Sequence, residues 1–199
     1  MTSTQAVTPR PVFWKTILKY GAIHFMVMTF GAFVLEVLQD YSGGCMFVVP
    51  AYFMVIPVVL SILTLQRFGA GIGVFLPYTV LGFFPTYYFE WFLSPNLVSI
   101  WGVVGWCLLG PIVGLTADLV FGFLPKTMPE KWRAVVLGVT IGVALFITTY
   151  LGLATFYRVP SMASHFRFFN SPYLFFSLPW LILNGGFAGY TAYAITKRV

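Results

Sequence analysis

The sequence predicts an all-α fold: a polytopic membrane protein whose chain forms a compact bundle of about six transmembrane helices. Two observations lead to this prediction. The 199 residues are 59% hydrophobic and only 8% charged, whereas a soluble domain carries about a quarter charged residues to cover its surface. The apolar runs are continuous rather than alternating with a period of two, which favours helices over a barrel. We therefore expect a multi-pass protein of the cell membrane, with the lipid bilayer as its solvent.

Apolar stretches follow one another along the chain, each long enough to cross about 30 Å of hydrocarbon at about 1.5 Å per residue. A polar tail, residues 1–12, precedes them and lacks the apolar core of a signal peptide, so it is predicted to be cytoplasmic. Residues 13–199 are predicted to form a single six-helix transmembrane domain. Only Gln66 and Arg67 separate the second stretch from the third, which predicts a tight hairpin. The predicted helices are Phe13–Leu38, Phe47–Leu65, Phe68–Trp91, Val98–Leu124, Trp132–Tyr157 and Tyr173–Ile195.

The basic residues predict the orientation of the bundle. With the N-terminus inside, nine of the 11 Lys and Arg residues fall on the inner side, and only Arg158 and Arg167 fall on the outer side. This bias indicates that both chain ends lie in the cytoplasm. No basic run interleaved with aromatic residues would follow a phosphate backbone, so nucleic acid is not an expected partner. The inner basic residues are Arg10, Lys15, Lys19, Arg67, Lys126, Lys131, Arg133, Lys197 and Arg198.

Glycines spaced four residues apart occur on four of the predicted helices. Such pairs lie on one helix face and let a neighbouring backbone approach closely. We expect them to pack the helices of this chain against one another, and docking of a partner subunit is the alternative. The pairs are Gly69/Gly73, Gly110/Gly114, Gly138/Gly142 and Gly185/Gly189.

The predicted topology directs charged residues from separate parts of the chain to the outer layer. They could form a polar mouth in which carboxylates and guanidiniums hold a small molecule, or each could mark the point where a helix leaves the membrane. Glu90 is the strongest candidate, because an unpaired carboxylate among the aromatic residues of PTYYFEWFL would be costly. The charged and polar residues of this layer are Glu36, Asp40, Glu90, Arg158, His165 and Arg167.

Aromatic residues such as Trp101 cluster near the same outer ends. Stacking surfaces beside a few charges suit a flat heterocycle, and an interfacial aromatic belt is the alternative. The predicted ligand-binding residues are Glu90, Trp101, Arg158, His165 and Arg167.

Three polar residues, His24, Asp118 and Asn184, lie within the predicted helices. For Asp118 and Asn184 we expect interhelical hydrogen bonds, with an ion or proton relay as the alternative. His24 has only His165 as a second histidine, predicted at a different depth, so no metal or haem site is expected. The chain also lacks GxxxxGK[ST], HExxH, GxSxG and CxxC motifs. We therefore expect neither enzymatic activity nor a cofactor.

Two sequence segments resemble those of a known family: GPIVGLTADLV in the fourth predicted helix and LPWLILNGGFAGYTAYAITKR in the sixth. With six helices, both ends inside and many small residues, the chain resembles the substrate-binding (S) components of energy-coupling factor (ECF) transporters. The resemblance implies a high-affinity binder whose outer loops close over a vitamin or related small molecule. A membrane scaffold subunit and separate ATPases would then supply the energy for uptake.

Two other functions fit the same sequence. The chain could be a non-catalytic accessory or structural subunit of a larger membrane complex, such as a respiratory or oxidase assembly, because its glycine pairs and aromatic surface suit subunit contacts. It could also be a small ion- or proton-coupled carrier that uses Asp118.

Overall fold

The computed structural model describes residues 10–42, 48–84, 100–156 and 173–198, with side chains described for residues 12–30, 51–84, 107–148 and 178–198. These ranges contain six helices and no strand, so the predicted all-α class is confirmed for them. The helices are α1 (Arg10–Ser42), α2 (Val48–Leu65), α3 (Ala70–Leu81), α5 (Ile100–Phe123), α6 (Glu130–Phe156) and α8 (Tyr173–Thr196).

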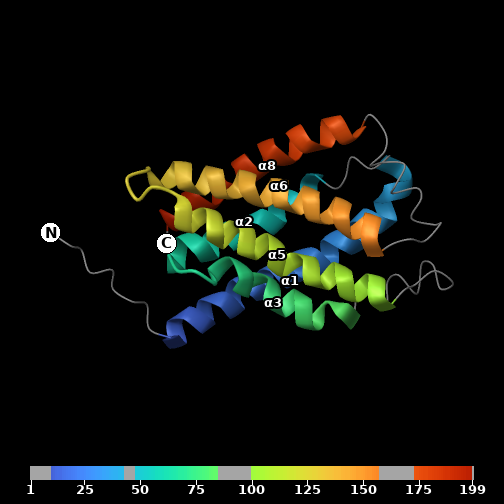
Figure 1. Cartoon of the computed structure of the whole chain (residues 1–199), viewed down its shortest axis with the longest axis horizontal. Helices are drawn as coiled ribbons and strands as arrows, with labels where there is room; N and C mark the ends of the chain where they lie inside the picture. The colour runs from blue at the N-terminus through green and yellow to red at the C-terminus, as the bar shows by residue number, and fades with distance from the viewer. Residues whose placement is uncertain (1–9, 43–47, 85–99, 157–172, 199) are drawn as a thin grey trace.

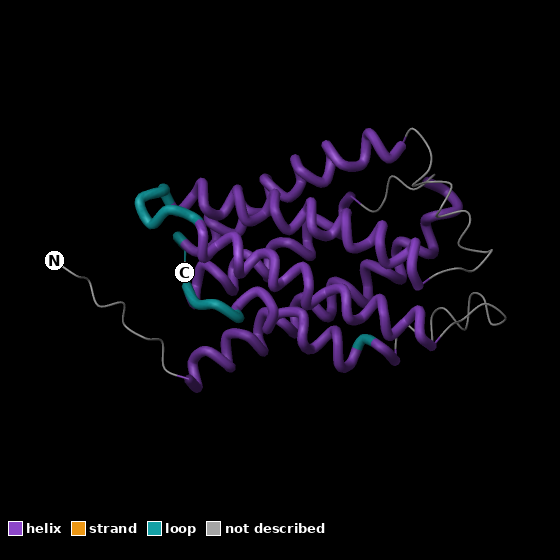
Figure 2. The backbone as a smooth tube through the Cα atoms, viewed as in Figure 1, coloured by secondary structure: helices purple, strands orange, loops and turns teal. Residues whose placement is uncertain are grey.

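The helices run alternately up and down the long axis of the bundle (Figure 1). The beginning of α1 and the end of α8 lie at one end, together with the short α2–α3 and α5–α6 turns (Figure 2). We call this the basic end, because the described lysines and arginines belong to these segments. At the opposite end, the far end, α1, α3 and α6 finish and α2, α5 and α8 begin.

Helix α2 forms the centre of the bundle and contacts each of the other five described helices. Val55, Val58, Val59 and Ile62 are essentially inaccessible to solvent. No charged residue occurs within α2, so all of its faces can be buried without leaving an unpaired charge. Its sequence therefore accounts for its central position.

Helices α6 and α8 make the most extensive helix contact in the described structure. The Gly138/Gly142 pair of α6 faces Gly185 and Gly189 of α8. A Cβ added at Gly142 would lie 2.6 Å from the carbonyl oxygen of Leu181, and one added at Gly185 would lie 2.9 Å from the carbonyl carbon of Gly138. The absence of side chains thus brings the two backbones into direct contact.

The remaining two glycine pairs also pack within the chain. A Cβ at Gly114 would lie 2.6 Å from the carbonyl oxygen of Gly71, and one at Gly110 would lie 2.6 Å from the Phe75 ring, so α5 packs closely on α3. Gly73 faces Ile17 of α1. The prediction that these glycines mediate packing between helices of the same chain is confirmed for seven of the eight, whereas Gly69 precedes α3 in a left-handed conformation and does not share a helix face with Gly73.

The helix boundaries differ from the predicted ones by one or two residues at several ends, and by more in α1 and in α3, which ends at Leu81 with Gly82 as its C-cap. Helix α1 begins at Arg10 rather than Phe13, because Pro11 is compatible with the first turn of a helix, so residues 10–12 of the predicted tail are helical. It continues to Ser42 rather than Leu38, because no Gly or Pro follows Leu38 before Gly43. The third helix begins at Ala70 rather than Phe68, because Gln66 (φ 48°) and Gly69 (φ 92°) adopt left-handed conformations. These two residues form the tight turn that the sequence predicted. Residues 85–91 of the predicted third helix lie outside the described residues.

Within the described residues, one segment, Glu130–Thr148, is both long and apolar enough to cross a membrane. Three shorter apolar segments, of 10–17 residues with described side chains, occur in α2, α3 and α5: Ala51–Leu65, Ala70–Leu81 and Cys107–Phe123.

Candidate functional site

The predicted ligand-binding residues lie almost entirely outside the described part of the chain. Glu90, Arg158, His165 and Arg167 belong to residues 85–99 and 157–172, which are not described. Trp101 lies in the first turn of α5, and its side chain is also outside the described set. The same is true of the side chains of Glu36 and Asp40 in the last part of α1. The predicted binding set therefore stays a prediction.

The described helix ends indicate where the segments with those residues join the bundle. Segment 85–99 connects the end of α3 with the beginning of α5, and segment 157–172 connects the end of α6 with the beginning of α8. All four of these helix ends lie at the far end (Figure 1). Both segments therefore attach to the end opposite the basic end.

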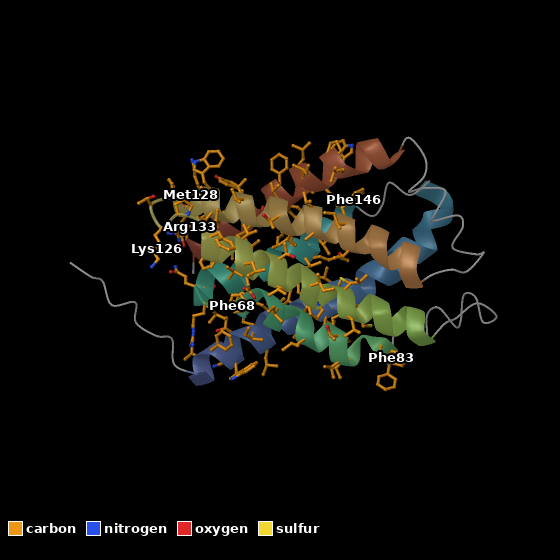
Figure 3. The ribbon with its side chains drawn as sticks, in the orientation of Figure 1. Phe68, Phe83, Lys126, Met128, Arg133 and Phe146 are labelled. Carbon is orange, nitrogen blue, oxygen red and sulfur yellow. The ribbon has the colours of Figure 1, made fainter. Side chains whose placement is uncertain are left out.

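An aromatic cluster packs between α1, α3 and α5 toward the far end. Tyr78 and Cys107 are buried, and Phe25, Met28 and Phe83 pack against them; Phe83 is labelled in Figure 3. We call these five residues the far-end cluster. Other aromatic residues were predicted for this layer; the spacing of Phe25 and Met28, three residues apart on one face of α1, was the available signal for these.

Thr79 fixes the position of α3 against α5 beside this cluster. Its Oγ1 lies 3.0 Å from the carbonyl oxygen of Phe75 and 3.1 Å from that of Cys107. The second contact crosses between the helices, so the hydroxyl satisfies an acceptor on the neighbouring helix as well as one on its own. The far-end cluster thus lies beside a polar contact that joins α3 to α5.

His24 is the most deeply buried polar side chain of α1. Its ring is fully buried and packs edge-on against Phe75, with ring centroids 4.4 Å apart and planes at 70°. Neither ring nitrogen has a hydrogen-bond partner among the described residues. The described residues contain no group of three His, Cys, Asp or Glu side chains that could hold a metal ion.

Asp118 of α5 is the best-satisfied buried polar group. Its Oδ1 accepts a hydrogen bond from the backbone N–H of Gly71 at 2.8 Å. Its Oδ2 accepts two more, from Gly69 at 3.1 Å and from Ile72 at 3.0 Å. The carboxylate therefore caps the N-terminus of α3, where unpaired N–H groups and the helix dipole favour a negative charge. The prediction that Asp118 makes interhelical hydrogen bonds is confirmed.

A side-chain hydrogen bond joins α8 to α2, the central helix of the bundle. The Tyr52 and Thr191 hydroxyl groups lie 2.7 Å apart and share one hydrogen bond between α2 and α8. Asn184, midway along α8, is partly buried, and its predicted interhelical hydrogen bond stays a prediction.

The basic end displays its cations next to aromatic rings. Four cations each lie 5.3 to 5.6 Å from an aromatic ring centroid, within the range of cation–π attraction. The hydrogen bond and charge of Glu130, 2.7 Å from Lys197, raise the pKa of the lysine. The cation–ring pairs are Lys19 with Tyr20, Arg67 with Phe13, Lys131 with Trp132, and Lys197 with Tyr193.

The fold and these sites define an all-helical bundle with a basic end and a polar cap on α3. No protein-family model, no curated protein and no solved structure matches the chain. Function is therefore inferred from the chain's own residues.

Proposed function

We propose that this chain is a multi-pass membrane protein that binds a small molecule, a vitamin or related heterocycle, at its far end. It would serve as the substrate-binding component of an uptake transporter whose energy comes from separate ATPase subunits. The observation that carries the proposal is the exposure of many large apolar side chains around the outside of a bundle whose mainly apolar core also contains four buried polar side chains.

Large apolar side chains are exposed along the middle of the helices. Phe30 of α1 is 60% exposed, Leu108 of α5 is 53% exposed and Phe187 of α8 is 65% exposed. The buried polar side chains His24, Ser61, Asp118 and Thr148 lie inside the same bundle. Water would disfavour this arrangement, since each buried polar group loses hydration while apolar surface stays wet. Lipid as the surrounding solvent removes the second cost.

Helix length and charge content support several crossings. Helix α2 has 18 residues and α8 has 24, and neither contains a charged residue. Helix α5 has 24 residues and only one charge, Asp118. At about 1.5 Å per residue these helices measure about 27, 36 and 36 Å, which compares with about 30 Å of hydrocarbon. The charged residues of α1 lie toward its two ends and leave residues 20–35 without one.

The position of the basic residues supports the orientation. The described lysines and arginines belong to the beginning of α1, the α2–α3 turn, the α5–α6 segment and the end of α8, which lie at the same end (Figure 1). Cytoplasmic ends of membrane proteins carry such an excess of positive charge. The basic end would thus face the cytoplasm and the far end would face outward.

The proposed ligand site lies at the far end. Segments 85–99 and 157–172, which attach there, carry Glu90, Arg158, His165 and Arg167. In the far-end cluster, Phe25, Met28 and Phe83 are only partly buried, and their aromatic and thioether side chains are of the kind that contacts flat rings. Small-molecule sites usually combine mainly apolar side chains with a few charged or polar groups. The resemblance to S components of ECF transporters supports the same assignment.

Ligand binding is tested with detergent-purified protein and a panel of water-soluble vitamins, measured by calorimetry. We expect one member to bind, and we expect Glu90→Gln and Arg158→Ala each to weaken its affinity by at least about tenfold, since each removes a charge-assisted contact. Glu130→Gln is the matched control, because it makes the same change at the basic end and should leave affinity unaltered. Unchanged affinity in both far-end variants would refute the site.

Co-purification separates the transporter component from the accessory subunit. Gentle solubilisation should retain a scaffold subunit and ATPases, whereas redox subunits with bound metals would support the accessory role instead. The carrier alternative predicts flux in liposomes without any partner. Asp118 argues against that alternative, because both of its oxygens accept backbone hydrogen bonds.

A further inference from the structure

We propose that the basic end contains a binding site for anionic phospholipid at the α5–α6 turn. The site consists of Lys126, Lys131 and Arg133 with the apolar side chains of Phe123 and Trp132, and we call it the turn cluster. The inference depends on the proposed membrane location but not on the proposed ligand site at the far end.

The turn that carries these cations is held by hydrogen bonds. Arg133 donates from Nη2 to the carbonyl oxygen of Lys126 at 2.8 Å. The Met128 N–H bonds to the carbonyl of Pro125 at 3.0 Å, and the Trp132 N–H bonds to that of Pro129 at 2.9 Å. Two prolines within five residues further restrict the backbone. Lys126, Met128 and Arg133 accordingly lie close together at this end (Figure 3).

The charges of the turn cluster lack a matching number of acidic neighbours. Among the described side chains only Asp118 and Glu130 are acidic. Asp118 is buried and caps α3, and Glu130 pairs with Lys197 at 2.7 Å. Lys126 and Lys131 are exposed, and their positive potential favours an anionic group from outside the described chain.

Apolar surface beside these cations identifies the occupant as an amphiphile. Phe123 is 86% exposed and Trp132 is 53% exposed. A Cβ added at Gly122, the residue before Phe123, would meet no other part of the described structure within 4 Å, so the helix surface at Gly122 is open. A phospholipid can place its phosphate near the lysines and its acyl chains along Phe123, whereas free phosphate would use only the cations.

Native mass spectrometry of the full-length protein tests this site with equal amounts of dioleoyl phosphatidylglycerol and phosphatidylcholine. We expect preferential retention of phosphatidylglycerol. The double change Lys126→Gln with Lys131→Gln should reduce its affinity by about 25-fold, that is, about fivefold for each lysine near an anionic surface. The matched control, Lys126→Arg with Lys131→Arg, keeps both charges and should retain the preference. Circular dichroism of both variants checks that the helices are intact.

Three results would overturn the proposal. The first is equal retention of the two lipids by the unaltered protein, and the second is an undiminished preference in the glutamine variant. The third is displacement of phosphatidylglycerol by millimolar inorganic phosphate or glycerol 3-phosphate, which would show that the acyl chains contribute nothing. If the protein instead retains an acidic protein and neither lipid, the two lipids are retained equally, and the proposal fails in the same way. If the protein needs no detergent for extraction, the membrane location itself fails, so the two failures are distinguishable.

Discussion

The contact between α6 and α8 predicts that two adjacent glycines differ sharply in their tolerance of a methyl group. A Cβ at Gly185 would lie 2.9 Å from the carbonyl carbon of Gly138 and 3.1 Å from the Cα of Val139, where ordinary contacts are 3.4–4 Å. A Cβ at Gly186 would lie 3.6 Å from Val139 Cγ2 and 3.8 Å from Val135 Cγ1, which is ordinary van der Waals contact. The first position meets backbone and the second meets only side chains.

The size of the effect follows from those distances. For Gly185→Ala the helices must separate by at least about 0.5 Å, and a gap of that size forfeits about a quarter of each contact energy along the interface. Overpacking costs about 1–3 kcal/mol, and a clash with backbone puts Gly185→Ala at the upper end of that range, so a net loss of about 2 kcal/mol remains after the gain of about 1 kcal/mol in helix propensity. Gly186→Ala keeps the gain without the clash. We expect the melting temperature to fall by about 4–8 °C for Gly185→Ala, and to stay level or rise by about 2–4 °C for Gly186→Ala.

Thermal unfolding in detergent, followed by tryptophan fluorescence, measures both variants. Trp132 in α6 and Trp180 in α8 report on the two helices concerned. Equal shifts in the two variants would refute the packing described for α6 and α8.

The same unfolding assay checks three further predictions. Asp118→Asn should lower the free energy of unfolding by about 2 kcal/mol, because an amide cannot accept all three hydrogen bonds that cap α3; no loss would contradict the cap. Tyr52→Phe should cost about 1 kcal/mol, and adding Thr191→Val should cost nothing more, since both changes remove one bond. His24→Leu should raise stability by about 1–2 kcal/mol, because a buried imidazole without a partner loses its hydration; destabilisation would indicate an unrecognised partner.

The helix pattern was predictable because the apolar runs end at strong local signals. The end of α2 at Leu65 was predicted from Gln66 and Arg67, and the beginning of α8 at Tyr173 was predicted as well. The extent of α1 was underestimated at both ends, because residues 10–12 were assigned to a polar tail and residues 39–42 to a loop on account of their polar composition. Local composition thus predicts where helices exist better than where they end.

The partners of the polar and small residues were less predictable. Asp118 and Gly71 are 47 residues apart, and no spacing rule links a carboxylate in one helix to the N-terminus of another. The alternation of glycines in FGAGIG, with Gly71 between Gly69 and Gly73, was the available signal for a close approach. Likewise, the four-residue spacing predicted that Gly138 and Gly185 mediate packing, but not that they face each other.

The candidate ligand site depends most on residues that were chosen from the sequence alone. Glu90 and Arg158 were selected because charges are costly in so apolar a chain. The described structure adds the far-end cluster, which the sequence analysis missed because Tyr78 and Cys107 come from different helices. Tertiary packing, rather than any local motif, brings those two residues together.

Labelling of single cysteines in intact cells tests most directly the central claim that the bundle crosses a membrane with its basic end inside. Cys45 and Cys107 are first replaced by alanine, and Thr127→Cys or Ser94→Cys is then introduced into the α5–α6 turn or segment 85–99. A membrane-impermeant maleimide should label the Ser94→Cys variant in intact cells and the Thr127→Cys variant only after permeabilisation. Labelling of the Thr127→Cys variant in intact cells, or recovery of either variant in the soluble fraction without detergent, would contradict the claim.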